Sequence, residues 1–274
     1  MKAIQPYFVM VTSKYHKKVM MKNGIAHFYK YSKNEQDMED IMAVPDGCVD
    51  LMFERDAHGI TGRAAGTVLQ RTTILNQEGK EFFGVRFLPG VLPAVLDVSL
   101  AELVSKELDL EDILYNKDML KEIEVAYEKG DWTQVFLKHY NRALCEKEKK
   151  EERAVVQMVR HLQRDIINSN GKITVAELAE GCSYSERYVN KVLTQTTGLN
   201  PKTFGKIIQF QKAIQMINEE PEEMRLTEIG LESGYYDQAH FVKEFKKYAA
   251  LTPREYRNLI KQCDYKQRIV VEEN

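Results

Sequence analysis

Arginine, asparagine and glutamine side chains stand at helical spacing in two short segments of the C-terminal half of this chain. Arg187 and Asn190 lie one helical turn apart in the first segment, and Gln238 and Lys243 belong to the second. Arginine can grip guanine, and asparagine or glutamine can grip adenine, through two parallel hydrogen bonds. These residue types therefore offer base-recognition chemistry, provided that helices present them on an exposed face.

The apolar positions of each segment show which side chains point outward. Val189, Val192 and Leu193 in the first segment, and Phe241 and Phe245 in the second, recur at helical spacing and should face inward. The remaining positions, the candidate base contacts, are Glu186, Arg187, Asn190, Lys191, Gln238, Ala239, His240, Val242 and Lys243. The candidate phosphate contacts, which would set position and affinity without reading sequence, are Lys202, Lys246, Lys247 and Arg254. An ordinary solvated helix face is the alternative.

Both segments lie in a stretch of sequence that occurs twice. The first copy is TVAELAEGCSYSERYVNKVLTQTTGLNP from Thr174, and the second is TEIGLESGYYDQAHFVKEFKKYAALTP from Thr227. From Ser185 and Asp237 onward the copies align at a constant offset of 52. Each copy predicts a short helix, a tight turn and a second helix, which is a helix-turn-helix whose second helix fits a DNA major groove. Chance similarity within an unrelated helical bundle is the alternative, and the matched tandem disfavours it.

Capping residues support the helical interpretation. Thr174, with a glutamate three positions later, has the spacing of a capping box. Ser185 and Asp237 can cap the second helix of each copy, and Gly198 follows the first of these helices as a C-terminal stop. Asn200-Pro201 then opens a connecting helix with a cap and a proline at its first position.

The segment from about Arg153 to Ile260 resembles the DNA-binding domain of AraC/XylS-type bacterial transcription regulators, most specifically in IGLESGYYDQAHFVKEFKKYAALTPREYR (229–257). The resemblance implies two helix-turn-helix units on a linker helix, with both recognition helices facing the same side of the DNA. Ala250 and Cys182-Ser183 replace glycines that are usual in the family. A left-handed Ala250 should cost about 1 kcal/mol. We expect slight destabilisation rather than loss of function.

Composition fits an ordinary globular protein of two domains. The chain has 274 residues, of which 43% are hydrophobic and 29% charged. Its N-terminus has too short an apolar run for a signal peptide, and no stretch approaches a membrane span, so we expect a cytoplasmic protein without a membrane partner. The scattered cysteines form no CxxC pair, which predicts reduced thiols, with a redox sensor as the minor alternative; they are Cys48, Cys145, Cys182 and Cys263.

The N-terminal part shows strand patterns instead. Turn signals such as Asn23-Gly24 separate β-rich runs at Tyr7–Thr12, Ala26–Tyr31, Cys48–Glu54, Arg71–Leu75 and Glu81–Leu88. Helical patterns follow from Val91 to Leu114, from Lys117 to Ala126 and from Asp131 onward. This half of the chain therefore predicts a sheet followed by helices.

Two N-terminal motifs, VPDGCVDLMFE (44–54) and FFGVRFLPG (82–90), resemble the domain found on one subgroup of these regulators. The resemblance implies a small cupin-like β-barrel followed by helices. The expected fold class is therefore α+β, with an all-α C-terminal domain that holds two helix-turn-helix units. We expect a sensing or dimerisation domain at 1–128, a helical linker at 129–152, and a DNA-binding domain at 153–262. Its helix-turn-helix units would lie at 174–195 and 227–248, and a tail at 263–274 would follow.

An enzymatic barrel is not expected. A metal cupin uses two histidines one residue apart plus a glutamate, whereas His16, His27 and His58 stand singly. Asp46 and Asp50 share a face with Glu54, which is more typical of a charged or turn-stabilising surface. DNA-repair proteins with a similar C-terminal domain would need a cysteine-rich zinc site at the N-terminus. We predict no catalytic residue, no metal and no cofactor, and keep a cupin-type enzyme fused to a DNA-binding domain as the weakest alternative.

The sequence thus predicts a sequence-specific DNA-binding transcription regulator that responds to a small-molecule effector through its N-terminal domain. Its partners would be double-stranded DNA and, as a further candidate, RNA polymerase. The alternative is a ligand-independent regulator whose N-terminal domain only dimerises. An apolar stripe between Trp132 and Ala143 predicts a homodimer held by residues before 150, unless the stripe packs on its own barrel. A speculative effector pocket, of residues that more often form a core or its rim, comprises Tyr29, Tyr31, Phe53, Arg86 and Phe87.

Overall fold

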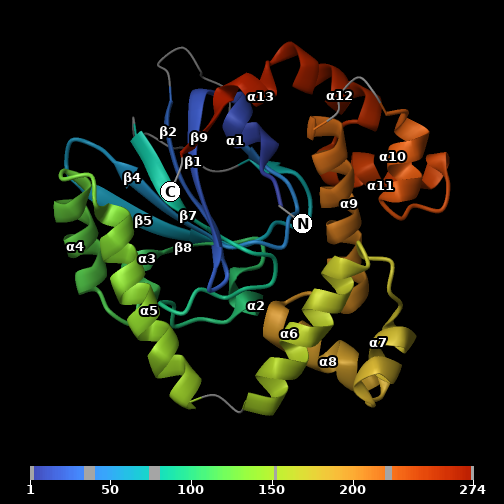
Figure 1. Ribbon diagram of the computed structural model, residues 1–274, viewed down its shortest axis with the longest axis horizontal. Coiled ribbons are helices and arrows are strands. Elements are labelled where there is room, and N and C mark those ends of the chain that lie inside the picture. The colour runs from blue at the N-terminus through green and yellow to red at the C-terminus, as the bar shows by residue number, and fades with distance from the viewer. Residues whose placement is uncertain (1–2, 34–40, 74–80, 151–152, 220–223, 273–274) are drawn as a thin grey trace.

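The computed structural model describes residues 3–33, 41–73, 81–150, 153–219 and 224–272. A twisted sheet forms the N-terminal half, and helices of the C-terminal half wrap around one side of it (Figure 1). This arrangement confirms the predicted α+β class. Within the described ranges, no helix is long and apolar enough to cross a membrane.

The main sheet has seven strands in the order β8-β5-β4-β7-β2-β1-β9, and a second sheet pairs β3 with β6. The strands are β1 Thr12–Lys22, β2 Ile25–Lys33, β3 Met42–Ala43, β4 Asp50–Arg55, β5 Ile60–Ala65, β6 Thr72–Thr73, β7 Glu81–Phe87, β8 Glu107–Asp109 and β9 Ile269–Glu272. Asn23 and Gly24, with φ values of 54° and 82°, make the tight turn between β1 and β2. An Asn-Gly pair favours this hairpin turn because both residues tolerate positive φ.

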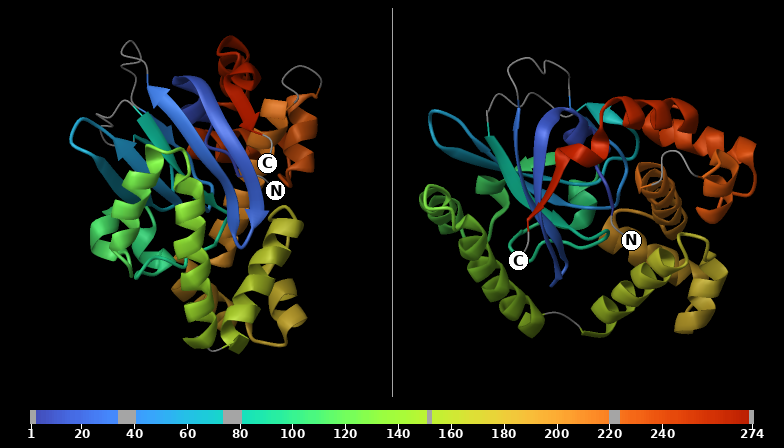
Figure 2. Two further views of the ribbon diagram at one scale, coloured as in Figure 1. Left: turned by 60° about the vertical axis from the view of Figure 1, so that its left-hand side comes forward. Right: turned by 45° about the horizontal axis from the view of Figure 1, so that its top comes forward.

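Two helices cover one face of the main sheet (Figure 2), α4 at Asp118–Tyr127 and α5 at Trp132–Lys150. Along α5, Trp132, Phe136 and Tyr140 are at most 8% exposed and pack on the rings of Phe28 and Phe87. This is the apolar stripe for which we predicted dimer contacts. The prediction that this stripe forms a dimer surface is wrong, because the stripe is buried against the sheet of its own chain.

The opposite face of the sheet packs against the C-terminal domain. One buried cluster joins Tyr31 of β2 with Phe210 of α9, the helix at Pro201–Glu219. The fully buried side chain of Gln211 accepts a hydrogen bond from the Ile4 N–H (2.7 Å) and donates one to the Pro45 carbonyl (2.8 Å). The two domains therefore share a core and direct hydrogen bonds.

The other helices complete both domains. They are α1 Pro6–Met10, α2 Leu100–Leu103, α3 Leu110–Ile113, α6 Arg153–Asn168, α7 Val175–Cys182, α8 Glu186–Thr197, α10 Leu226–Glu232, α11 Gln238–Ala249, α12 Pro253–Gln262 and α13 Tyr265–Arg268. In Figure 1, the α7–α8 and α10–α11 pairs lie toward opposite ends of α9.

Two N-terminal segments differ from the sequence prediction. The expected strand at Tyr7–Thr12 is mostly the helix α1, because Pro6 at its first position fixes a helical φ and the apolar residues that follow are buried from several sides. The expected helix at Val91–Leu114 contains only the short α2 and α3, with β8 between them. Pro93 and the left-handed Ser105 (φ 55°) are incompatible with one continuous helix.

The end of the chain, expected to be a tail at 263–274, forms α13 and β9 over its described part. Strand β9 pairs in parallel with β1, from Tyr15↔Ile269 to Lys18↔Glu272. The Arg268 guanidinium donates to two carbonyls, that of Met10 at the end of α1 (2.6 Å) and that of Thr12 at the start of β1 (2.7 Å). The last described residues of the DNA-binding half are therefore built into the N-terminal sheet.

Candidate DNA-binding surface

Local capping fixes the first helix-turn-helix unit, α7 and α8. The Thr174 hydroxyl accepts from the Glu177 N–H (3.2 Å), and the Glu177 carboxylate accepts from the Thr174 N–H (2.7 Å). The Ser185 hydroxyl caps α8 by accepting the N–H of the residue three positions on (3.2 Å). Ser183, with φ 58°, makes the left-handed turn between the helices. The caps expected from the sequence are thus confirmed.

Helix α8 has one buried face and one exposed face. Its buried residues include Val189, Val192 and Leu193, at most 7% exposed. Glu186, Arg187 and Lys191 are exposed on the other side, and neither Arg187 nor Lys191 forms an ion pair with any described residue. Asn190 is half-buried, and its amide donates to the Glu186 carbonyl (2.9 Å). Hydrogen bonding to DNA would require this amide to leave that carbonyl.

The second unit, α10 and α11, repeats this geometry. The Asp237 carboxylate caps α11 by accepting the His240 N–H (2.7 Å), and Phe241 and Phe245 are fully buried. Outside lies an open hollow whose lining includes Gln238, Ala239, Val242 and Lys243. Gln238, Ala239 and Lys243 are exposed, whereas Val242 is half-buried.

His240 differs from its neighbours on α11. It is half-buried, and its ring packs at 72° to the Tyr235 ring, with the two centroids 5.6 Å apart. Its buried Nδ1 has no hydrogen-bond partner among the described residues. The structure therefore places this side chain against the protein rather than out with Gln238 and Lys243.

The four candidate phosphate contacts, Lys202, Lys246, Lys247 and Arg254, are all exposed. Lys202 and Arg254 lie in the first turns of α9 and α12, and the other two lie in the last turn of α11. Lys246, Lys247 and Arg254 thus lie at the adjoining ends of α11 and α12, and Lys202 lies one turn before Lys206, which contacts α11.

An ion pair sets α11 against α9. Lys206 Nζ of α9 lies 2.8 Å from the Glu244 carboxylate of α11, and the Glu244 side chain is 13% exposed. Burial raises the pKa of Glu244, but the hydrogen bond and charge of Lys206 outweigh burial, so that the pKa lies below its ordinary value. The carboxylate therefore remains ionised and holds the second recognition helix on the connecting helix.

Two exposed tyrosines were missed by the sequence reasoning. Tyr184 (52% exposed) immediately precedes the cap of α8, and Tyr236 (88% exposed) immediately precedes the cap of α11. The Tyr184 ring stacks on Tyr188 at 4.8 Å. The offset of 52 pairs these two tyrosines, and this pairing could have marked them as members of the same surface.

The N-terminal domain contacts α8 at its C-terminal end. Val104, which follows α2, packs against the buried cluster of the first unit. Gly198 ends α8 with φ 72°, and a Cβ at this position would lie 2.7 Å from the Ala101 Cα. The contact leaves Glu186, Arg187 and Lys191, in the first half of the helix, exposed.

The five residues of the speculative effector pocket do not line one cavity. Tyr31 packs in the core shared with the C-terminal domain, whereas Phe53 stacks on Phe83 (5.1 Å) in the core beneath α4 and α5. Tyr29 borders one cleft, and Arg86 and Phe87 border another. The prediction failed because neighbouring residues of a strand point to opposite faces of a sheet.

The two N-terminal motifs meet in a buried ion network. Arg86, which is 4% exposed, donates to the carboxylates of Asp46 and Asp50, the latter at 2.7 Å. Asp46 also accepts from the Cys48 N–H (2.9 Å) and the Gln5 amide (2.8 Å). Among the described residues there is no group of three or more His, Cys, Asp or Glu that could hold a metal. The aspartates are instead held by an arginine and by the turn.

The comparisons with known proteins agree with this geometry. A family model described as a helix-turn-helix domain matches residues 178–259, which span both units. This chain carries an AraC-type DNA-binding domain. A second model, described as a domain of unknown function (DUF6597), matches residues 18–109, which include both N-terminal motifs. Both family resemblances seen in the sequence are therefore confirmed.

Individual relatives cover the AraC-type domain better than the whole chain. An uncharacterized HTH-type transcriptional regulator of Haemophilus influenzae is 30% identical over 86 residues, 31% of this chain and 28% of that protein. The C-terminal domain of AraT, a response regulator from Geobacillus stearothermophilus, has 25% identity and a TM-score of 0.35, covering 37% of this chain and 84% of that one. ToxT from Vibrio cholerae has 12% identity and a TM-score of 0.42, covering 85% of this chain and 96% of that one.

Proposed function

We propose that this protein is a sequence-specific transcription regulator that reads two successive major grooves with α8 and α11. The observation that carries the proposal is the matched exposure of two helices 52 residues apart in the sequence. Each helix buries an apolar face and turns cations outward, and α11 also turns out the amide of Gln238. A recognition helix needs this division of faces, because its donors and acceptors must be free to meet base edges.

The roles of individual side chains follow from their exposure. Arg187 and Lys191 on α8, and Gln238 and Lys243 on α11, would read bases, whereas Ala239 and Val242 would contact thymine methyl groups. Lys202 and Arg254 would anchor the backbone phosphates. Because cations on both helices lack ion-pair partners among the described residues, DNA would not have to break internal salt bridges to bind them.

The N-terminal domain is proposed to regulate DNA binding. Its sheet shares a buried core with α9 and carries β9, so a change in the sheet reaches the DNA-binding helices through direct contacts. We assign it a small-molecule effector and no catalytic activity, metal or cofactor. The alternative is that this domain only dimerises, but the surface on α5 that we predicted for the dimer is buried within the chain. We retain a cytoplasmic homodimer bound to paired sites as part of the proposal, with RNA polymerase as a further partner.

Footprinting on a DNA site selected from random sequence tests the double reading. Each protomer should protect two major-groove patches about one helical turn, ~34 Å, apart on one face of the DNA. Arg187→Ala should weaken one patch and Gln238→Ala the other, which assigns each helix to its groove. Protection of a single groove per protomer, or loss of the same patch in both variants, would show that the units do not read side by side.

A further inference from the structure

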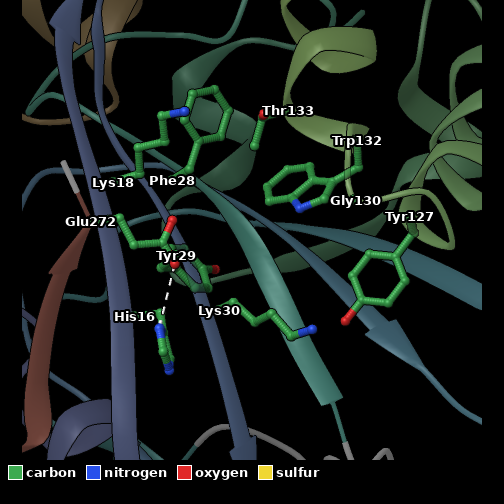
Figure 3. A pocket seen from close by; sticks show the side chains of 10 residues that line it. All are labelled: His16, Lys18, Phe28, Tyr29, Lys30, Tyr127, Gly130, Trp132, Thr133 and Glu272. Carbon is green, nitrogen blue, oxygen red and sulfur yellow. Dashed lines mark ion pairs between the residues drawn. The ribbon is translucent and has the colours of Figure 1, made fainter. Parts of the chain in front are cut away.

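A cleft of about 270 Å³ lies on the face of the main sheet that carries α4 and α5, beside the start of α5 (Figure 3). Strands β1, β2 and β9 form its floor, and the start of α5 forms its wall. Its size is close to the lower end of small-molecule sites, which span about 300–1,000 Å³. A molecule with one or two rings would fill it.

The floor of the cleft is basic. The register pairs Lys18 with Phe28 and His16 with Lys30, so these four side chains rise from the same face of the sheet. Lys30 already lies over the ring of Tyr127 (4.8 Å). Lys18 forms no ion pair with any residue that the structure describes. At least one cation in the cleft is therefore without a counter-charge.

The wall of the cleft is aromatic and carries an unused donor. Trp132 meets Phe28 edge to face, with ring centroids 5.5 Å apart, and is 8% exposed. Its indole N–H donates to no acceptor among the described residues, and Figure 3 shows this nitrogen on the side of the ring that faces the cleft. This nitrogen is not among the buried polar atoms without a partner, so it is open to the cleft and can donate to a bound molecule.

A carboxylate of the chain itself reaches into this cleft from β9. Glu272 is paired in register with Lys18, and its carboxylate lies 3.4 Å from Nδ1 of His16 (Figure 3). Both side chains of this pair are about half-exposed, at 52% and 41%. An exposed contact of this kind, which is an ion pair only when His16 is protonated, contributes about 0–1 kcal/mol, so a better-placed anion could replace Glu272 at little cost.

We propose that the cleft binds a small ring-bearing carboxylate, with its ring against the wall that Trp132 forms and its carboxylate on Lys18 and His16. The ligand competes with Glu272 for His16 and so loosens the pairing of β9 with β1. Because β9 and Arg268 join the end of the DNA-binding domain to the sheet, binding is transmitted toward the DNA-binding helices. Only this last consequence rests on the proposed regulatory function.

Trp132 is the only tryptophan of the chain, so its fluorescence reports on the cleft without any need for DNA. Phenylacetate titrated into the full-length protein should give a saturable change, and the neutral phenylacetamide should not. Lys18→Ala should weaken phenylacetate binding roughly tenfold, the loss expected for one charge-assisted hydrogen bond. Lys22→Ala, an exposed lysine at the end of the same strand, is the matched control and should bind as the parent does.

Glu272→Gln separates competition from simple binding. It removes the resident carboxylate and should tighten phenylacetate binding several-fold, whereas a Glu272 with only a structural role would leave binding unchanged or weaker. Hydrogen exchange of the β9 amides should quicken when phenylacetate is added to the parent. The absence of a saturable response at millimolar phenylacetate, or an equal response to the amide, overturns the site. Unchanged affinity in Glu272→Gln overturns the competition, and neither result depends on whether the protein regulates transcription.

Discussion

Ala250 offers a direct measure of the strain stored in the second recognition helix. It ends α11 in the left-handed conformation, with φ 56° and ψ 9°, and its N–H donates to the Lys246 carbonyl (2.9 Å). This conformation costs a residue with a Cβ about 1–2 kcal/mol, whereas glycine adopts it freely. Glycine also gains about 0.4–1 kcal/mol of conformational entropy in the unfolded chain. Ala250→Gly should therefore raise the free energy of unfolding by about 0.5–1 kcal/mol.

The equivalent position of the first unit provides a control of opposite sign. Gly198 ends α8 with φ 72°, and an added Cβ would lie 2.6 Å from Val104 Cγ2 and 2.7 Å from Ala101 Cα. Gly198→Ala combines left-handed strain with a clash against the N-terminal domain. Overpacking of this kind costs about 1–3 kcal/mol. Replacing alanine by glycine should thus stabilise the end of α11, and replacing glycine by alanine should destabilise the end of α8.

Urea unfolding followed by circular dichroism measures both variants. Ala250→Gly should raise the midpoint without changing the slope, which marks a change in stability rather than in the unfolded state. In a chain of this size the melting temperature should rise by about 2 °C. Preference among DNA sequences should not change, because Ala250 lies at the opposite end of α11 from the candidate base contact Gln238. A lower midpoint for Ala250→Gly, or a neutral Gly198→Ala, would refute the strain argument.

Three further measurements address DNA binding, pH and assembly. Arg187→Ala should cost roughly 1–3 kcal/mol of binding free energy on the cognate duplex and little on a scrambled one. Lys202→Ala should weaken binding to both duplexes and lower the slope of log affinity against log salt by about one. Equal losses on both duplexes would make Arg187 a backbone contact. The pKa of Glu244 is lower in the folded protein than in the unfolded chain. Its ionised carboxylate therefore stabilises the fold fully above the unfolded pKa, and this stabilisation is lost as pH falls through the folded pKa. Lys206→Met should flatten the acid side of a plot of urea midpoint against pH. Light scattering of the full chain at micromolar concentration should show a dimer of the 31.8 kDa chain, and a monomer would remove the homodimer from the proposal.

The sequence predicts the DNA-binding domain well because its signals are local. A capping box such as Thr174 with Glu177 lies within four residues, and the apolar spacing of Val189 and Val192 defines the buried face of α8 without knowledge of the rest of the fold. Ser183 and Ala250, which stand where the family usually has glycine, both take the left-handed conformation that the resemblance implies. His240 is the exception, because its direction depends on the ring of Tyr235 in the preceding turn.

The N-terminal half is predicted less well because its signals are not local. The hairpin at Asn23-Gly24 follows from two neighbouring residues, but the effector pocket required knowledge of which face each strand residue takes. Phe53 and Tyr31 are both aromatic strand residues, yet one packs beneath α4 and α5 and the other packs against the C-terminal domain. Sequence alternation separates the two faces of one strand, but it does not say which face meets which helix.

Strand β9 shows where prediction from pattern must fail. Ile269–Glu272 is too short for a periodic signal, and the contacts that position it join residues 256 and 258 positions apart, from Arg268 to Thr12 and to Met10. These contacts have a functional consequence. The first helix-turn-helix unit meets the N-terminal domain beside Gly198, whereas the second shares its core with the sheet and is joined to it by β9. If α8 and α11 read successive grooves as we propose, they must match one turn of DNA. A domain that contacts each unit separately would then control their spacing, and therefore the affinity of the pair for its site.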